Sequence, residues 1–225
     1  MARILISFSG IDGAGKSTQI DKLREHLTAR EIPVEILTFW DNVVVLSSLR
    51  SGFSRKVLQS DGQVGTPDKP AARNDKNQQS LPLFAGRSIL HLLDVFRLRQ
   101  IARHVRSSEK AGVVIFDRYI YDQLAALPLK KPWARAYARL ILAVAPKPDV
   151  AYVLDAVPEE ARARKPEYPL EFMRQYRESY LELQQLAPVN VIKPGMPDDV
   201  HAAILGRLTK LFDSPQAPVD STVAA

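Results

Sequence analysis

The sequence predicts a three-layer α/β fold, in which helices cover both faces of a five-stranded parallel sheet. Short apolar runs alternate with helix-like segments along the chain, which is the pattern of repeated strand–helix units. The runs are apolar throughout, as in parallel strands that are buried on both faces. The composition, 225 residues of which 46% are hydrophobic and 25% charged, supplies enough apolar material for one sizeable core.

The expected elements follow in chain order. The strands are residues 4–8, 34–39, 113–116, 150–154 and 189–192. The helices are residues 17–30, 83–106, 132–144, 169–186 and 197–212, with a shorter helix that starts at Pro158. Residues 132, 169 and 197 are prolines, which suit a first helical turn. In the longest helix we expect Ile89, Leu93, Phe96 and Ile101 to face inward and Arg99, Arg103 and Arg106 to face outward.

One domain is expected over residues 1–212, with two exceptional segments. Residues 51–80 form a polar insertion with three glycines and two prolines, and the interpretations of a functional lid and of a disordered loop both stay open. Residues 158–170 form a short basic lid, and residues 213–225 form a flexible tail.

Composition excludes several classes of protein. The chain has no cysteine, so it has no disulfide framework, thiolate metal site or cysteine nucleophile. Its apolar runs are far shorter than the roughly 20 residues that cross a bilayer, and its N-terminus lacks the pattern of a secretory signal. We therefore expect a cytoplasmic protein without a membrane contact. The net charge of +6 favours an anionic partner, and we expect nucleotide phosphates rather than nucleic acid, because no nucleic-acid-binding signature is found.

Residues 10–17, Gly-Ile-Asp-Gly-Ala-Gly-Lys-Ser, match the phosphate-binding pattern GxxxxGK[ST] between an expected strand and an expected helix. A chance match in a chain of this length is expected on the order of 1% of the time. Glycine amides and the helix N-terminus attract phosphate oxygens, the lysine reaches the β and γ phosphates, and the serine hydroxyl ligates Mg²⁺. The expected ATP-binding set is Gly10, Gly13, Ala14, Gly15, Lys16, Ser17 and Thr18.

Asp117 and Arg118 directly follow the third expected strand, at the edge of the sheet where open α/β proteins bind ligands. Asp117 is a candidate metal ligand together with Ser17, and Arg118 is a candidate clamp for a phosphate. A structural ion pair at a strand end is the alternative interpretation.

Basic residues follow the fourth strand. Arg162, Arg164 and Lys165 are expected to form a lid that neutralises charge on transferring phosphates. A solvated basic helix face is the alternative. Arg87, His91 and Asp94 share one face of the longest helix and are candidates for the lining of a substrate pocket.

These motifs together resemble the thymidylate kinase family of P-loop nucleoside monophosphate kinases. The resemblance covers most of residues 1–212 and is carried by residues 9–19, by the triplet Asp117-Arg118-Tyr119 and by the basic segment at Arg162. The segments 83–87 and 148–155 are similar to the start of the family's base-binding helix and to the strand that precedes its lid.

The resemblance implies transfer of the γ-phosphoryl group of ATP to the 5′-phosphate of dTMP with Mg²⁺ bridging, and a possible homodimer through the long helix. It implies that Asp12 binds the sugar 3′-hydroxyl, Arg118 the acceptor phosphate and Arg87 the base carbonyl, with Phe84 stacked on the base. Lys16, Arg118, Arg162 and Arg164 would be the catalytic residues, the last two because Ala14 leaves the P-loop without a basic residue of its own. The expected substrate-binding set is Asp12, Phe84, Arg87, Asp117, Arg118 and Gln123.

The chain departs from the family pattern on the acceptor side. Residues 38–42, Thr-Phe-Trp-Asp-Asn, replace an Arg-Glu-Pro-Gly-Gly segment, so one acceptor-site arginine is missing. Ser9 stands where an acidic residue is common, Phe84 precedes Arg87 by three positions rather than four, and Ala126 replaces a tyrosine that packs on the deoxyribose.

Two other functions stay open at the level of sequence. A deoxynucleoside kinase would use a general base near the end of the second strand, for which Asp41 is the candidate. A non-catalytic nucleotide-dependent switch is the third, since a P-loop alone does not fix function.

Overall fold

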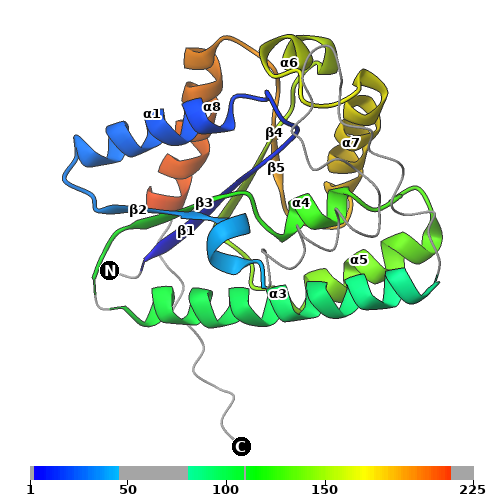
Figure 1. Ribbon diagram of the computed structural model, residues 1–225. Helices are drawn as coiled ribbons and strands as arrows, with labels where there is room; N and C mark the ends of the chain where they lie inside the picture. Colours follow the sequence, from blue (N-terminus) through cyan, green and yellow to red (C-terminus); the bar gives the residue numbers. More distant parts are fainter. Residues whose placement is uncertain (1–2, 46–80, 109, 214–225) are drawn as a thin grey trace, which may run out of the picture.

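A computed structural model describes residues 3–45, 81–108 and 110–213, with the backbone alone for 81–87 and 210–213. Its centre is a five-stranded parallel sheet in the order β2-β3-β1-β4-β5 (Figure 1). The strands are β1 (Ile4–Ser9), β2 (Val34–Thr38), β3 (Val113–Asp117), β4 (Val150–Leu154) and β5 (Asn190–Ile192). The predicted fold class is confirmed.

The central position of β1 follows from its composition. All six of its residues are buried, as expected for a strand with a neighbour on each side and helices on both faces. It pairs with β3 from Ile4 opposite Val113 to Phe8 opposite Asp117, and with β4 from Ile6 opposite Val150. This register brings the ends of β1, β3 and β4 to one edge of the sheet.

The helices form two layers around the sheet. They are α1 (Lys16–Thr28), α3 (Leu81–Ser107), α4 (Ile120–Ala125), α5 (Pro132–Val144), α6 (Pro158–Arg164), α7 (Leu170–Leu183) and α8 (Pro197–Asp213), with a π-helical turn η1 (Phe39–Val43). Apolar residues of α1 and α8 pack with Ile4 and Ile6 on one face of the sheet. Apolar residues of α3, α4, α5 and α7 pack with Leu5 on the other face (Figure 1).

Four predicted strand ends are wrong by one residue. The first and third strands each continue one residue further than predicted, to Ser9 and Asp117. The second strand stops at Thr38, because Phe39 begins the turn η1 and turns its ring into the core, where it is fully buried. The amide of Thr38 donates a hydrogen bond to Oδ1 of Asn42 at 2.8 Å, which closes the turn. The fifth strand starts at Asn190 rather than Val189. The short helix α4 was not predicted.

The inward face of the long helix α3 differs from the prediction. Ile89, Leu93 and Phe96 are 60%, 41% and 58% exposed, whereas Leu98 is fully buried and Ile101 packs against the core as expected. Two polar side chains, His91 and Asp94, take the buried positions. They can do so because both have hydrogen-bond partners in the interior.

Within the described residues, no helix is long and apolar enough to span a bilayer. The predicted insertion at 51–80 and the tail beyond residue 213 lie outside the described residues. The expected tail starts one residue too early, since α8 continues through Asp213.

Candidate active site

The P-loop lies between β1 and α1, as predicted. Gly10, Gly13 and Gly15 have φ angles of 140°, 80° and 86°, which L-residues with a side chain rarely adopt. Gly15 is the N-cap of α1, and the first turn of that helix carries no acidic residue. The N-terminal amides and the helix dipole therefore present an unopposed positive end to an anion.

Two of these glycines are also required by close packing. A Cβ on Gly10 would lie 2.5 Å from the carbonyl oxygen of Leu154, at the end of β4. A Cβ on Gly13 would lie 2.2 Å from the carbonyl oxygen of Ala161, in α6. A Cβ on Gly15, in contrast, would meet open space. The P-loop is thus pressed against the backbone of α6, which sequence reasoning did not foresee.

Lys16 is buried inside its own loop. Its Nζ donates to the carbonyl oxygens of Gly10 and Ile11, both at 2.9 Å. Burial, reinforced by the positive charge of Arg118, lowers the pKa of Lys16 to about 8, against the opposing pull of nearby carboxylates. The loop therefore holds a cation ready at the position where the P-loop pattern puts a phosphate.

Ser17 and Thr18 are exposed on the first turn of α1, so both hydroxyls are accessible. Asp117, half-buried at the end of β3, adds a carboxylate at the same edge of the sheet. The described residues contain no group of three or more His, Cys, Asp or Glu side chains that could hold a metal ion by themselves. A hydroxyl and one carboxylate fit Mg²⁺ that is carried in with phosphate oxygens.

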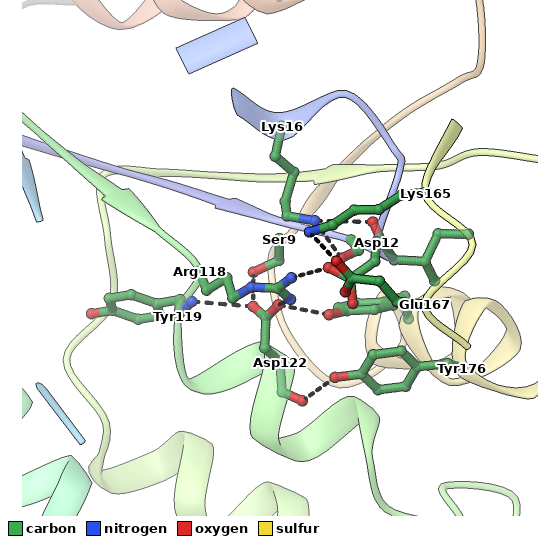
Figure 2. Close-up of polar contacts among 12 residues, drawn as sticks. Ser9, Asp12, Lys16, Arg118, Tyr119, Asp122, Lys165, Glu167 and Tyr176 are labelled. Atoms are coloured by element: carbon green, nitrogen blue, oxygen red, sulfur yellow. Dashed lines mark hydrogen bonds and ion pairs between the residues drawn. The ribbon is translucent and has the colours of Figure 1, made fainter. Parts of the chain in front are cut away.

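Arg118 bridges two carboxylates across this edge (Figure 2). Its Nη1 donates to Oδ1 of Asp122 at 2.9 Å, and its Nη2 donates to Oδ1 of Asp12 in the P-loop. Burial would lower the pKa of Arg118, but the two carboxylates outweigh it and hold the pKa above its usual range. The φ angle of Arg118 is 69°, a costly conformation for a residue with a side chain.

Three cations converge on Asp12. Arg118 is paired with it, and Lys16 and Lys165 point toward it from α1 and from the segment after α6 (Figure 2). Burial raises the pKa of Asp12, but the fields of these three cations outweigh that effect and hold the pKa below its ordinary value. The predicted donor-side and acceptor-side residues therefore meet at one point.

Asp122 is a site residue that sequence reasoning missed. Its side chain is 1% exposed and receives hydrogen bonds from Ser9, Arg118, Tyr119 and Tyr180. An available signal was the spacing, because an acidic residue three positions after a helix cap is typical of a capping box.

The predicted pocket residues of α3 form a second polar group. Oδ2 of Asp94 accepts a hydrogen bond from Nε2 of Gln123 at 2.6 Å, and Oδ1 accepts one from the amide of Val45. His91 is buried and contacts the hydroxyl of Tyr137 at 3.0 Å. The amide oxygen Oε1 of Gln123 is buried without a hydrogen-bond partner among the described residues. The side chains of Phe84 and Arg87 lie outside the described residues.

The three basic residues predicted to form a lid have different surroundings. Arg162 is half-buried, and its Nε donates to the carbonyl oxygen of Tyr168. Arg164 is exposed and lines a cleft of about 50 Å³ beside the P-loop. Lys165 forms an ion pair with Glu167 at 3.2 Å. Arg162 is thus held against the main chain of the segment after α6, whereas Arg164 lies beside the P-loop.

The cleft beside Ala14 was also missed. The segment between β5 and α8 forms its outer wall through Lys193, Pro194 and Gly195, and α6 contributes Glu160. These residues match no phosphate-binding sequence pattern. They come close to the P-loop because β5, which precedes them, pairs with β4 in the sheet.

A glycine-rich loop on a helix N-terminus, with a buried lysine and an arginine facing it at the carboxyl edge of a parallel sheet, defines a P-loop nucleotide-binding protein. No family model matches the chain. A probable thymidylate kinase of Thermococcus kodakarensis is 31% identical over 223 residues, covering 93% of this chain and 98% of that protein. The chain belongs to the thymidylate kinase family.

Further comparisons agree. A thymidylate kinase of Pelodictyon phaeoclathratiforme is 28% identical over 241 residues, covering 96% of this chain and all of that protein. The crystal structure of thymidylate kinase from Ehrlichia chaffeensis has a TM-score of 0.58 at 18% identity and covers 93% of this chain and 99% of that one. The thymidylate kinase structure from Candida albicans has a TM-score of 0.62 at 18% identity, with 96% of each chain covered. The structural likeness establishes the fold.

Proposed function

We propose that this protein transfers the γ-phosphoryl group of ATP to the 5′-phosphate of dTMP, forming dTDP and ADP. The observation that carries the proposal is the pairing of Arg118 with Asp12, which sets a phosphate-binding arginine directly against the P-loop. The likeness to thymidylate kinases over nearly the whole chain supports the choice of acceptor.

On the donor side, the amides of Gly13 and Gly15 and the N-terminus of α1 bind the phosphates of ATP. Lys16 exchanges its two carbonyl partners for the β and γ phosphate oxygens. Thr18 binds the α phosphate. Arg162 and Arg164 belong to a lid over residues 158–170 that neutralises charge developing during transfer.

Ser17 and Asp117 hold Mg²⁺ in this proposal. When bound, Mg²⁺ neutralises charge on the β and γ phosphates and so supplies electrostatic stabilisation of the transition state. The exposure of Ser17 and the half-buried carboxylate of Asp117 at the same sheet edge support this assignment.

On the acceptor side, Arg118 binds the 5′-phosphate, and Asp12 binds the 3′-hydroxyl of the sugar. The buried Oε1 of Gln123 supports a role in binding the base, because an acceptor without a partner inside a protein is costly unless a ligand donates to it. Phe84 and Arg87 complete the proposed base pocket.

A deoxynucleoside kinase is the less favoured function. Its candidate general base, Asp41, has an exposed side chain in the turn η1. The likeness to thymidylate kinases over nearly the whole chain supports a phosphate acceptor instead.

The chain also has a surface suited to a homodimer. Ile89, Leu92, Leu93 and Phe96 are 41–60% exposed and lie at helical spacing on one side of α3. An exposed apolar stripe of this kind is typical of an interface. We propose a cytoplasmic homodimer that pairs through this stripe and binds small nucleotides, not nucleic acid.

The test is an ADP-release assay with ATP, Mg²⁺ and a panel of dTMP, dUMP, UMP, CMP, thymidine and deoxycytidine. Turnover confined to monophosphates, with dTMP preferred, is expected. Turnover of nucleosides alone would contradict the proposal in favour of the deoxynucleoside kinase, and no turnover at all would favour a binding module. Lys16→Ala serves as the inactive control, because it removes the loop cation without disturbing the sheet.

A further inference from the structure

The buried carboxylate of Asp122 gives its two oxygens different partners. The residue lies in the first turn of α4, next to the strand end that carries Arg118 (Figure 2). A carboxylate that is 1% exposed needs several donors to offset the loss of its hydration. The partners of the two oxygens come from different parts of the fold.

Oδ2 fixes the carboxylate to the scaffold. It accepts a hydrogen bond from Oγ of Ser9, at the end of β1, at 2.6 Å. It accepts a second from the amide of Tyr119, at the start of α4, at 3.1 Å. Ser9 belongs to the central strand and Tyr119 is the N-cap of α4, and both are fully buried, so Oδ2 locates the carboxylate relative to the central strand.

Oδ1 faces the site. It accepts hydrogen bonds from Nη1 of Arg118 at 2.9 Å and from the hydroxyl of Tyr180, in α7, at 2.7 Å. Burial raises the pKa of Tyr180 well above its usual range, so the hydroxyl stays protonated and remains a donor. The same helix also bonds the main chain of Asp122, through the hydroxyl of Tyr176 at 2.7 Å.

The other carboxylate on Arg118 differs in its surroundings. The side chain of Asp12 is 15% exposed and sits on the P-loop, whereas that of Asp122 is fully buried. A ligand phosphate can take the place of Asp12 on Nη2, because the displaced carboxylate of Asp12 is partly exposed to solvent. If a phosphate replaced Asp122, the buried carboxylate of Asp122 would lose its charged partner, which is costly. The bond from Nη1 to Asp122 is therefore the permanent one.

We propose that Asp122 is a positioning residue: with Ser9 and Tyr180 it holds Arg118 so that the other donors of the guanidinium face the phosphate of the acceptor nucleotide. This proposal rests on the proposed function. A guanidinium has five N–H donors in a fixed plane, so fixing Nη1 sets the direction of the rest. The same anchoring holds the unfavourable backbone conformation of Arg118.

A purely structural role for Asp122 makes a different prediction. As a helix cap and hydrogen-bond centre alone, it would contribute to stability and leave substrate affinity unaffected. The two roles are distinguished by the KM values: a positioning role raises the KM for the acceptor and leaves the KM for ATP unchanged, whereas a structural role changes neither.

The experiment compares Asp122→Asn and Tyr180→Phe with Tyr152→Phe. Tyr152 is a matched control, because its buried hydroxyl donates to the carbonyl oxygen of Ile204 at 2.9 Å on the opposite face of the sheet. In Asp122→Asn we expect the acceptor KM to rise roughly tenfold to a hundredfold. In Tyr180→Phe we expect a rise of about threefold to tenfold. The KM for ATP should stay unchanged in both, and Tyr152→Phe should alter neither KM.

A second measurement does not depend on turnover. Nitrogen-15 NMR of the arginine side chains should show slow rotation of the Arg118 guanidinium in the wild type and faster rotation in Asp122→Asn and Tyr180→Phe. Fast rotation in the wild type, or unchanged acceptor KM values in both variants, would overturn the positioning role. If Asp122→Asn does not fold, Tyr180→Phe and Ser9→Ala decide the question. Absence of any dTMP turnover by a wild type with slow rotation would instead count against the proposed function alone.

Discussion

The guanidinium of Arg118 and the carboxylate of Asp12 form an ion pair that joins the end of β3 to the P-loop. The pair therefore connects the loop that we propose to bind the donor phosphates with the arginine that we propose to bind the acceptor phosphate.

Replacing Arg118 should affect the acceptor far more than the donor. Arg118→Ala removes a charged phosphate ligand, and we expect the acceptor KM to rise about tenfold to a hundredfold with little change in the KM for ATP. Steady-state kinetics with each substrate varied in turn measures both values. Arg135→Ala is a suitable control, because it breaks an ion pair with Glu182 that lies on α5 and α7. An unchanged acceptor KM in Arg118→Ala would exclude this role.

The lowered pKa of Lys16 predicts a pH dependence of ATP binding. In the free protein Lys16 loses its proton near pH 8, whereas bound phosphates stabilise the protonated form and raise its pKa. Binding therefore takes up a proton above pH 8, and affinity should fall by up to about tenfold per pH unit there. Calorimetric titration from pH 7 to 9.5 measures this slope. In Lys16→Arg the side chain stays charged, so the ATP affinity of a folded variant should not change between pH 7 and 9.5. If the affinity of that variant also falls with pH, a group other than Lys16 causes the effect.

The two P-loop glycines Gly13 and Gly15 should differ in their tolerance of alanine. Gly15→Ala meets open space and costs only backbone strain, about 1–3 kcal/mol. Gly13→Ala has a similar backbone strain and, in addition, a clash with the backbone of Ala161. It should therefore lower Tm and weaken ATP binding more than Gly15→Ala does. Thermal unfolding and calorimetry on the two variants test this order. Equal losses in both would show that the contact with α6 is unimportant.

A charge within the exposed stripe of α3 should dissociate the proposed dimer. Phe96 is 58% exposed, so Phe96→Arg should leave the stability of the subunit nearly unchanged while it halves the mass in solution. Leu140→Arg is the matched control, since Leu140 is 59% exposed on α5 and lies outside the stripe. Sedimentation equilibrium distinguishes the two. A wild-type protein that is monomeric at micromolar concentration would refute the dimer.

Loss of the Asp12 carboxylate should destabilise the ligand-free protein in a pH-dependent manner. Its pKa lies below the ordinary value when folded, so its contribution is fully present above about pH 4 and is lost as pH falls through the lower, folded pKa. Asp12→Asn should lower stability by about 1–3 kcal/mol at pH 7, because three cations then lack their shared partner. The difference from the wild type should vanish in strong acid. Chemical denaturation at several pH values measures the difference in the free energy of unfolding between the two proteins. A difference that does not change with pH would contradict the electrostatic cause.

The sequence was sufficient to predict the fold class, all five strands within one residue, and the P-loop. These features depend on local patterns: apolar runs mark the strands, and glycines with a lysine mark the phosphate loop. The buried face of α3 was predicted wrongly, because hydrophobicity selected Ile89 and Phe96 for the interior. Asp94 is buried instead, because the side chain of Gln123 and the amide of Val45, both remote in sequence, donate hydrogen bonds to its carboxylate.

The long-range hydrogen bonds of Asp122 could not be predicted for a similar reason. Three of its hydrogen bonds come from β1, from the end of β3 and from α7, and only the fold brings these segments together. The absence of an acidic residue at Ser9 was visible as a departure from the family. The carboxylate at this point of the site is supplied instead by α4, across a 2.6 Å hydrogen bond from Ser9.

The packing of Gly13 on Ala161 and of Gly10 on Leu154 makes the phosphate loop and the segment above β4 one mechanical unit. Because no side chain lies between the backbones of Gly13 and Ala161, we expect any displacement of α6, which ends at Arg164, to move the phosphate loop with it. A side chain at either glycine would separate these backbones, so neither position accommodates another amino acid without a shift of β4 or α6.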